Sequence, residues 1–228
     1  FAPGNDWNSE LIRGIGGNEG INSALSLGIN ANHEFSKKFE VQGFYYLTQN
    51  NGELDKAVNT ENFARSQTFK TNQEINNNED KLNHSFNLKA DWQADSMTKI
   101  NLWSNLFLNH ERYDNRNRTV FTPSNETTDF TQNNNDNDVQ KSSTYNSATY
   151  KRKFKKDRRN VNIYLNHYGL NQENTTKINN ELFGTPINQL QEYDQTQSRW
   201  RGGVSYTEPL DSFWVATIGY SNEQERQE

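Results

Sequence analysis

The sequence predicts an all-β fold, namely a segment of an antiparallel, up-and-down transmembrane β-barrel with about eight strands. Three observations lead to this prediction. Apolar residues fall on every second position over several stretches, which is the period of a strand with one apolar and one polar face. The connections between these stretches alternate between short and long. No apolar stripe of helical period and no apolar run of about 18 residues competes with this interpretation.

The first predicted strand pair lies in residues 21–47, where the alternation is clearest. A short polar turn, Ser36 to Lys38, separates its two strands. The alternating residues are Ile21, Ser23, Leu25, Leu27, Ile29, Ala31, His33 and Phe35 before the turn, and Phe39, Val41, Tyr45 and Leu47 after it. Such a pair presents one continuous apolar face on a chain that is otherwise polar.

Three further pairs of strands repeat this pattern, the middle one more weakly. Each pair again consists of two alternating stretches on either side of a few polar residues, so that the chain contains eight predicted strands. The remaining strands are predicted, in order, at 82–94 and 100–108, at 148–154 and 161–165, and at 200–206 and 214–220.

The connections indicate how such a barrel is oriented. Short connections lie near residues 37, 96, 157 and 210, whereas long polar stretches occupy 50–80, 112–141 and 171–196. Because transmembrane barrels combine short periplasmic turns with longer extracellular loops, we predict short periplasmic turns and long extracellular loops here. Residues 1–20 are expected to form a loop leading into the first strand, and residues 1–228 a single region of a larger barrel.

The composition is compatible with a barrel but leaves two alternatives open. Of the 228 residues, 31% are hydrophobic and the net charge is −5, values that by themselves favour disorder. The aromatic content of 12% and the presence of only four prolines argue against it. In a barrel the alternating apolar residues face lipid and the polar residues line a wet interior. A soluble β-sandwich or solenoid and a largely disordered chain remain as alternatives, and the acidic charge gives no case for nucleic-acid binding.

The polar faces of the predicted strands carry the candidate functional residues. Aromatic rings alternate there with Asn and Gln side chains, a combination that contacts sugars, peptides or metal chelates. The same rings are also suited to pack against a plug or to fill space between strands, and we favour this packing role. The candidate lumen or substrate contacts are Phe44, Tyr46, Trp103, Phe107, Tyr164 and Tyr168.

The sequence predicts no catalytic, cofactor or metal site, and we expect the protein not to be an enzyme. No cysteine is present, so disulfides and thiolate metal sites are excluded. His84 and His110 are predicted to be diagonal neighbours on paired strands, but no suitably spaced carboxylate joins them. The basic run from Lys151 to Arg159 spans a predicted turn, which indicates a solvated turn at the membrane rim, in contact with acidic lipid head groups or a periplasmic partner.

Three stretches resemble a known family. They are "SLGINANHEFSKKFEVQGFYYL", "LNHSFNLKADWQADSMTKINLWSN" and "VSYTEPLDSFWVATIGYSNEQ", and the resemblance extends over about residues 14–228. The family consists of outer-membrane β-barrel proteins related to TonB-dependent receptors, and the resemblance is to an internal part of the barrel. Nothing resembling a plug or TonB-contacting box precedes Phe1, and no terminal aromatic residue ends the chain at Glu228, so we expect a fragment rather than a small closed barrel.

The resemblance implies a location in the bacterial outer membrane, in contact with its lipid, and nutrient uptake as the function. It also implies, for the full-length parent, a TonB-type energy-coupling protein and a surface lipoprotein as partners, with no cofactor. Two other functions remain open: a non-transporting structural or adhesive surface barrel, and a soluble carbohydrate-binding β-domain.

Overall fold

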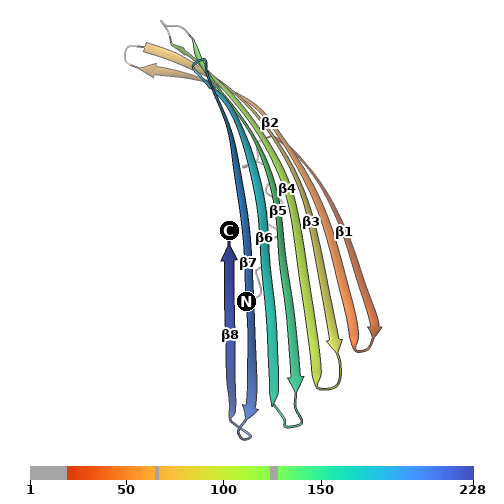
Figure 1. Cartoon of the computed structure of the whole chain (residues 1–228). Helices are drawn as coiled ribbons and strands as arrows, with labels where there is room; N and C mark the ends of the chain where they lie inside the picture. The colour runs from red at the N-terminus through yellow and green to blue at the C-terminus, as the bar shows by residue number, and fades with distance from the viewer. Residues whose placement is uncertain (1–19, 65–66, 124–127) are drawn as a thin grey trace.

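The computed structural model describes residues 20–64, 67–123 and 128–228, which form a single eight-stranded sheet. The strands follow one another across the sheet in sequence order, β1 to β8, and each is antiparallel to its neighbours (Figure 1). Within the described ranges, no helix is long and apolar enough to cross a membrane. The strands are β1 (Ile21–Ser36), β2 (Phe39–Ala64), β3 (Gln67–Gln93), β4 (Thr98–Pro123), β5 (Asp129–Lys153), β6 (Asn160–Leu182), β7 (Thr185–Pro209) and β8 (Val215–Gln227).

This arrangement confirms the predicted all-β, antiparallel, up-and-down order of about eight strands. The four predicted short turns join β1 to β2, β3 to β4, β5 to β6 and β7 to β8, and all lie at one end of the sheet (Figure 1). The predicted loop at residues 1–20 falls almost entirely outside the described residues; only Gly20, with a φ of 91°, lies within them.

The prediction of long loops is wrong. Residues 50–80, 112–141 and 171–196 are occupied mostly by strand, so that β2, β3, β4, β5 and β7 reach 25 to 27 residues. Only Phe183 and Gly184 separate β6 from β7. These segments carry polar side chains on both faces, which removes the period-two signal from the sequence. Continuous backbone pairing with a neighbour nevertheless satisfies their peptide groups.

The register of the sheet brings the alternating apolar residues of all strand pairs to one face. Paired residues lie side by side on the same face of an antiparallel sheet, so one row can be followed from strand to strand. One row of this face, which lies towards the short-turn end on β1 to β5, is His33, Val41, Ala90, Leu102, Ala148, Leu165, Gly202 and Asn222. We call this side the band face and the opposite side the polar face.

The apolar residues form a band that covers only part of each strand. Beyond the band, the band face carries polar and charged side chains, and we call this further portion of the sheet the extension. On β1 to β8 respectively, the band comprises the band-face residues of 25–35, 39–47, 82–92, 100–108, 144–150, 161–167, 200–206 and 216–220.

The sheet has no hydrophobic core. Apart from Pro209 at the end of β7, no apolar side chain is buried in the described part of the chain, and many large ones of the band are open, including Ile29 at 67% and Ile218 at 77% exposure. The other buried side chains are polar: Thr48, Asn77, Glu79, Asn83, Thr98 and Ser143. The described residues therefore form one layer whose apolar side has no protein partner.

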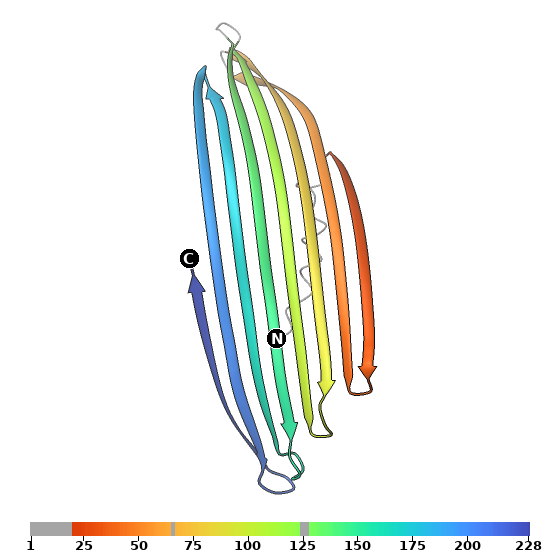
Figure 2. The same cartoon turned by 45° about the vertical axis from the view of Figure 1, so that its right-hand side comes forward.

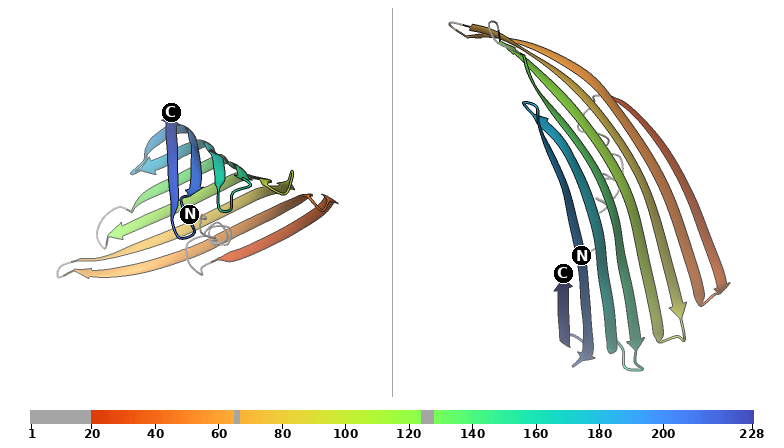
Figure 3. Two further views of the ribbon diagram at one scale, coloured as in Figure 1. Left: turned by 90° about the horizontal axis from the view of Figure 1, so that it is seen from below. Right: turned by 45° about the horizontal axis from the view of Figure 1, so that its top comes forward.

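The sheet is twisted and bent but does not close. β1 and β8 are paired on one side only and lie at opposite margins of the sheet when it is viewed from below (Figures 2 and 3). A right-handed strand twist produces this coiling in any sheet of long strands. Among the described residues the fold is thus an open wall of eight strands, as expected of a barrel segment.

Candidate functional site

The polar face holds all six aromatic residues predicted as lumen contacts, and the register brings them together. They occupy four adjacent cross-strand rows in the same portion of the sheet that carries the apolar band on its other side. One row contains Phe44, Asn87, Asn105, Tyr145, Tyr168 and Arg199. The next row away from the short turns contains Tyr46 and Phe107, and the next two rows towards the short turns contain Trp103 and Tyr164 respectively.

Most of these rings rest on the sheet or on one another. Phe44 and Tyr46 are stacked with ring centroids 6.1 Å apart, and the space above Gly28 is filled by Tyr46, whose Cδ2 would lie 3.4 Å from an added Cβ. Tyr164 covers Gly203 in the same way, at 2.6 Å. Rings laid over glycines stabilise a sheet at positions that lack side chains. These contacts support the packing role of Phe44, Tyr46 and Tyr164.

Tyr145 belongs to this set and was missed in the sequence. Its ring lies 5.1 Å from that of Trp103, and it occupies the row between Asn105 and Tyr168. The parity of β5, on which Ala148 and Tyr150 face the band, would have placed Tyr145 on the polar face. Phe44 and Trp103 keep exposures of 42% and 37%, so part of the aromatic surface remains open to a ligand.

Amide side chains connect the strands between and beyond these rings. Asn105 Nδ2 donates to Asn87 Oδ1 at 2.7 Å, and Asn109 Nδ2 donates to Asn83 Oδ1 at 2.6 Å. Asn83 in turn donates to Thr48 Oγ1 at 3.2 Å. The arrangement presents aromatic surface beside amide donors and acceptors, which is the chemistry that binds sugars and peptides.

A second feature, which the sequence did not predict, is a charged hollow on the band face of the extension. It has a volume of about 910 Å³ and spans β1 to β6. Two cross-strand rows supply most of its charges: Asp80, Arg112 and Asp138 in one, and Glu53, Asp114, Asp136 and Lys177 in the other; Arg116, in the next row, pairs with Asp114 at 2.9 Å. These residues were assigned to loops in the sequence, where no pairing between them was foreseeable.

The two β5 carboxylates in this hollow have opposite electrostatic surroundings. Partial burial and the facing carboxylate of Asp114 raise the pKa of Asp136. Partial burial also acts to raise the pKa of Asp138, but hydrogen bonds from Arg112 Nε at 3.0 Å and His110 Nε2 at 3.1 Å outweigh it and lower that pKa. The hollow therefore contains one carboxylate that is stabilised in its charged form, Asp138, and one that is destabilised in its charged form, Asp136.

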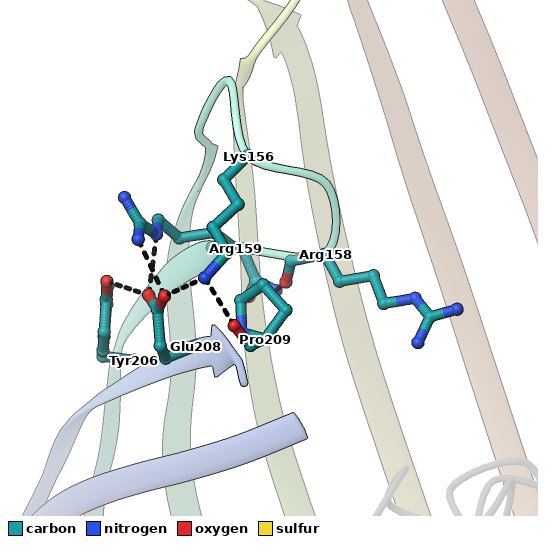
Figure 4. Close-up of polar contacts among 7 residues, drawn as sticks. Lys156, Arg158, Arg159, Tyr206, Glu208 and Pro209 are labelled. Atoms are coloured by element: carbon teal, nitrogen blue, oxygen red, sulfur yellow. Dashed lines mark hydrogen bonds and ion pairs between the residues drawn. The ribbon is translucent and has the colours of Figure 1, made fainter. Parts of the chain in front are cut away.

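A third feature lies at the end of the sheet with the short turns, where the basic run was predicted to form a solvated turn. Glu208, just beyond the band on β7, accepts hydrogen bonds from Arg159, Lys156 and Tyr206, all at 2.7 Å (Figure 4). Lys156 Nζ also donates to the Pro209 carbonyl at 2.5 Å. Hydrogen bonds from Arg159, Lys156 and Tyr206 lower the pKa of Glu208 to about 2. The turn is therefore clamped to the end of β7.

His84 and His110 are diagonal neighbours, as predicted, but the sequence did not predict that a carboxylate, Asp138, contacts His110. The register makes His84 and His110 diagonal neighbours, since His84 pairs with Leu108 and Leu82 with His110. His84 Nδ1 instead lies 2.8 Å from the Tyr45 hydroxyl, and His110 faces Asp138. Over the residues whose positions are described, no group of three or more His, Asp or Glu side chains is arranged to hold a metal ion.

Comparison with known proteins adds little. No protein-family model and no curated protein matches the chain. A structure of the membrane pore complex of pneumolysin, determined by cryo-electron microscopy, aligns with 89% of this chain at 8% sequence identity and a TM-score of 0.15. The alignment covers 31% of the pneumolysin chain, and at this TM-score the likeness has no bearing on function. The class that the geometry defines is a single-layer antiparallel β-wall with one apolar and one polar face.

Proposed function

We propose that this chain forms part of the wall of a bacterial outer-membrane β-barrel of the TonB-dependent-receptor type, and that the barrel takes up a nutrient across the outer membrane. The observation that carries the proposal is the uncovered apolar band. A sheet that exposes this much contiguous apolar surface to water would aggregate, whereas lipid solvates the same surface. The opposite polar face then lines an aqueous lumen.

The dimensions of the band support this assignment. On β4 the band runs over 100–108, about 27 Å of strand at about 3.3 Å per residue. A strand tilted by about 40° crosses the ~25 Å apolar layer of an outer membrane in roughly ten residues. The remainder of β4, up to Pro123, carries charges on both faces and would stand in water beyond the lipid. Long strands that rise above the membrane thus replace the predicted long loops.

A soluble β-sandwich is less compatible with these faces. In a sandwich, the apolar faces of two sheets pack together and their side chains become buried. The described sheet is one layer, and its buried side chains, Pro209 apart, are polar and lie mainly on the face opposite the band. A soluble carbohydrate-binding domain of this sequence would need a second apolar sheet over the band.

The polar face favours a transporter over a purely structural or adhesive barrel. Seven aromatic residues, the six predicted ones and Tyr145, share adjacent rows with Asn side chains in the part of the sheet that carries the apolar band on its other face. A barrel that acts only through its external surface does not need rows of aromatic and amide side chains in its lumen. In the full-length protein, a TonB-type energy-coupling protein and a surface lipoprotein would be the partners that the uptake requires.

The membrane assignment is tested by labelling single cysteines in intact cells that carry the full-length protein. Phe183 lies in the β6–β7 turn and is 64% exposed, and Asp157 lies in the β5–β6 turn with a side chain that is 98% exposed. Each is replaced singly, as Phe183→Cys and Asp157→Cys. We expect a membrane-impermeant maleimide to label the first but not the second, and both after lysis. Equal labelling in intact cells, with the protein in the soluble fraction, would rule out a spanning wall.

Uptake is tested separately from location. Trp103→Ala, which removes an open ring from the polar face, should reduce growth on an oligosaccharide or peptide nutrient that depends on this protein. Phe121→Ala is a matched control, because Phe121 is equally exposed at 37% but lies at the far end of β4. Correct insertion of both variants with unchanged growth would favour the structural or adhesive barrel.

A further inference from the structure

A small basic hollow lies at the β5–β6 connection. Its volume is about 270 Å³, and its charged lining consists of Lys151, Lys153, Arg158 and Arg159 together with a single carboxylate, Asp157. Asn160 and Phe154 complete the lining. Four cations face one anion within ten residues of chain, although the whole chain is acidic. The hollow therefore has a local excess of positive charge.

The lysines of the hollow have no carboxylate partner. Neither Lys151 nor Lys153 makes an ion pair with any residue in the described ranges. Lys151 also pairs across the sheet with Lys99 of β4, and like charges directly opposite each other destabilise a sheet. A bound anion would relieve this repulsion. Both lysines belong to the polar face, since they alternate with band-face residues Tyr150 and Arg152.

Arg158 is held in place by the turn. It adopts a left-handed backbone conformation, with a φ of 62°, and its Nη1 donates to the Ser212 carbonyl of the neighbouring turn at 3.0 Å. Asn160 Nδ2 donates to the Arg158 carbonyl at 3.0 Å, and Phe154 N donates to the Arg159 carbonyl at 3.0 Å. Residues with a Cβ adopt this region uncommonly, and the surroundings hold the backbone there; the contact with Ser212 orients the guanidinium.

The cationic side chains of this turn differ in their partners. Arg159 and Lys156 are bound to Glu208, and the Arg158 side chain extends away from that cluster (Figure 4). The contacts of Arg159 and Lys156 with Glu208 fix the turn, and Lys151, Lys153 and Arg158 take no part in them. The nearest carboxylate to Arg158 is Asp157, at 3.9 Å from Nε, and its side chain is 98% exposed. Three cations thus remain available to one ligand.

We propose that this hollow binds a phosphate group. A phosphate monoester carries a charge of about −1.5 to −2 at pH 7 and three acceptor oxygens, which matches a hollow lined by three such cationic side chains better than a singly charged carboxylate does. Arginine and lysine together are the usual phosphate ligands of proteins. The phosphate belongs either to a soluble phosphorylated compound or to the head group of an anionic phospholipid that reaches the rim of the sheet beside the turn; the latter is a phosphodiester and carries a single negative charge. The binding site is independent of the proposed transport function.

Binding is tested on the full-length protein in phosphatidylcholine nanodiscs by titration calorimetry with inorganic phosphate. We expect the Lys151→Gln/Lys153→Gln double variant to bind phosphate at least tenfold more weakly than the wild type. Lys37→Gln/Lys38→Gln, which removes the same charge from the β1–β2 turn at the same end of the sheet, should bind as the wild type does. The charge-retaining Lys151→Arg/Lys153→Arg variant should restore binding.

Two results would overturn the proposal: no binding by the wild type at millimolar phosphate, or equal weakening in both glutamine double variants. The source of the phosphate is distinguished by repeating the titration in phosphatidylglycerol nanodiscs. If the lipid head group occupies the hollow, the apparent affinity for inorganic phosphate falls several-fold in the wild type but not in Lys151→Gln/Lys153→Gln. If the ligand is soluble, wild-type affinity relative to that of Lys37→Gln/Lys38→Gln is the same in both lipids.

Discussion

Arg159 and Glu208 meet through two parallel hydrogen bonds, from Nε to Oε2 and from Nη2 to Oε1, each 2.7 Å long. The contact joins the β5–β6 turn to the end of β7, 49 residues further along the chain. Bidentate guanidinium–carboxylate pairs combine charge with a fixed geometry. Because Lys156 and Tyr206 also donate to Glu208, this one carboxylate organises the end of the sheet that carries the basic hollow.

The Glu208 contact predicts a specific pH dependence of stability. Its pKa in the folded protein is about 2, lowered first by the hydrogen bond from Arg159 and then by those from Lys156 and Tyr206. Since the unfolded chain has the higher pKa, near 4.5, ionised Glu208 stabilises the fold fully above about pH 4.5. This contribution is lost as the pH falls from there through about 2.

The measurement is the urea unfolding midpoint of wild type and Glu208→Gln across this pH range. We expect the variant to be less stable above about pH 5, and the difference to shrink steadily towards pH 2. Asp157→Asn serves as the control, because this carboxylate of the same turn is fully open to solvent and accepts no such set of hydrogen bonds. A pH-independent difference for Glu208→Gln would show that the carboxylate charge is unimportant.

Neighbouring residues on β5 distinguish the two faces of the wall. Ala148 lies within the band, between Leu102 and Leu165, whereas Thr149 lies on the polar face. Arginine on the lipid face of a barrel costs about 2–4 kcal/mol at the bilayer midplane and less towards the interfaces. We therefore expect Ala148→Arg to lower the free energy of unfolding in lipid by up to this amount, and Thr149→Arg to change it by less than about 1 kcal/mol.

Equilibrium urea unfolding in phosphatidylcholine bilayers measures both variants. Ala148 has almost no side chain to lose, so the substitution reports on the introduced charge rather than on lost packing. If Thr149→Arg proves the more damaging of the two, the band face is not in contact with lipid and the proposed orientation of the wall is wrong.

The sequence was sufficient to predict the face of each residue within the band, because a strand alternates strictly between its two sides. The parity of Phe44 or Trp103 relative to nearby apolar residues places its side chain on the polar face without further information. The sequence did not reveal that these residues share adjacent rows. Their proximity depends on the register between strands, and the register depends on connection lengths that the sequence had overstated.

The extension was missed for a different reason. Segments such as "NQEINNNED" have polar side chains on both faces and are rich in Asn, which strands generally disfavour. Their strand structure arises from neighbouring strands, through backbone pairing and through cross-strand amide contacts such as Asn115 Nδ2 to Asn77 Oδ1 at 2.6 Å. Local sequence patterns do not contain information on such cross-strand contacts. The charged hollow, which is built on these strands, could therefore not be predicted from the sequence either.

The charged hollow predicts opposite effects for two like substitutions. Asp136 faces Asp114 on one side and Lys177 on the other, and partial burial together with Asp114 outweighs Lys177, because the pKa of Asp136 is raised. Asp138 instead receives hydrogen bonds from Arg112 and His110. Like charges placed opposite each other destabilise a sheet by roughly 0.2–1 kcal/mol, and opposite charges stabilise it by a similar amount. Asp136→Asn should therefore be neutral to stabilising at pH 7, and Asp138→Asn destabilising, each by up to about 1 kcal/mol.

The same difference should appear in the pH dependence of stability. Because the pKa of Asp136 is raised in the folded state, its contribution favours folding at low pH and is lost as the pH rises through that pKa. For Asp138, whose pKa is lowered, the contribution is present above the unfolded pKa and is lost on acidification. Unfolding midpoints of the two variants at pH 7 and about pH 3 separate these effects; parallel behaviour would contradict the paired arrangement of the hollow.

Tyr164 and Gly203 provide a test of the packing role of the polar-face rings. A Cβ added at Gly203 would lie 2.6 Å from Tyr164 Cε1, whereas a Cβ added at Gly43 meets nothing within 4 Å. Replacing a strand glycine by alanine reduces the entropy of the unfolded chain and stabilises by about 0.4–1 kcal/mol where there is room. We expect this gain for Gly43→Ala. For Gly203→Ala we expect a net loss of about 1 kcal/mol, because the Tyr164 ring is displaced.

A double-mutant cycle isolates the contact. In a Tyr164→Ala background the obstructing ring is absent, so Gly203→Ala should become as favourable as Gly43→Ala is in the wild type. Urea unfolding of the four proteins gives the coupling energy directly. A coupling energy near zero would mean that Tyr164 does not rest on Gly203, and its ring would then be free in the lumen to contact a substrate.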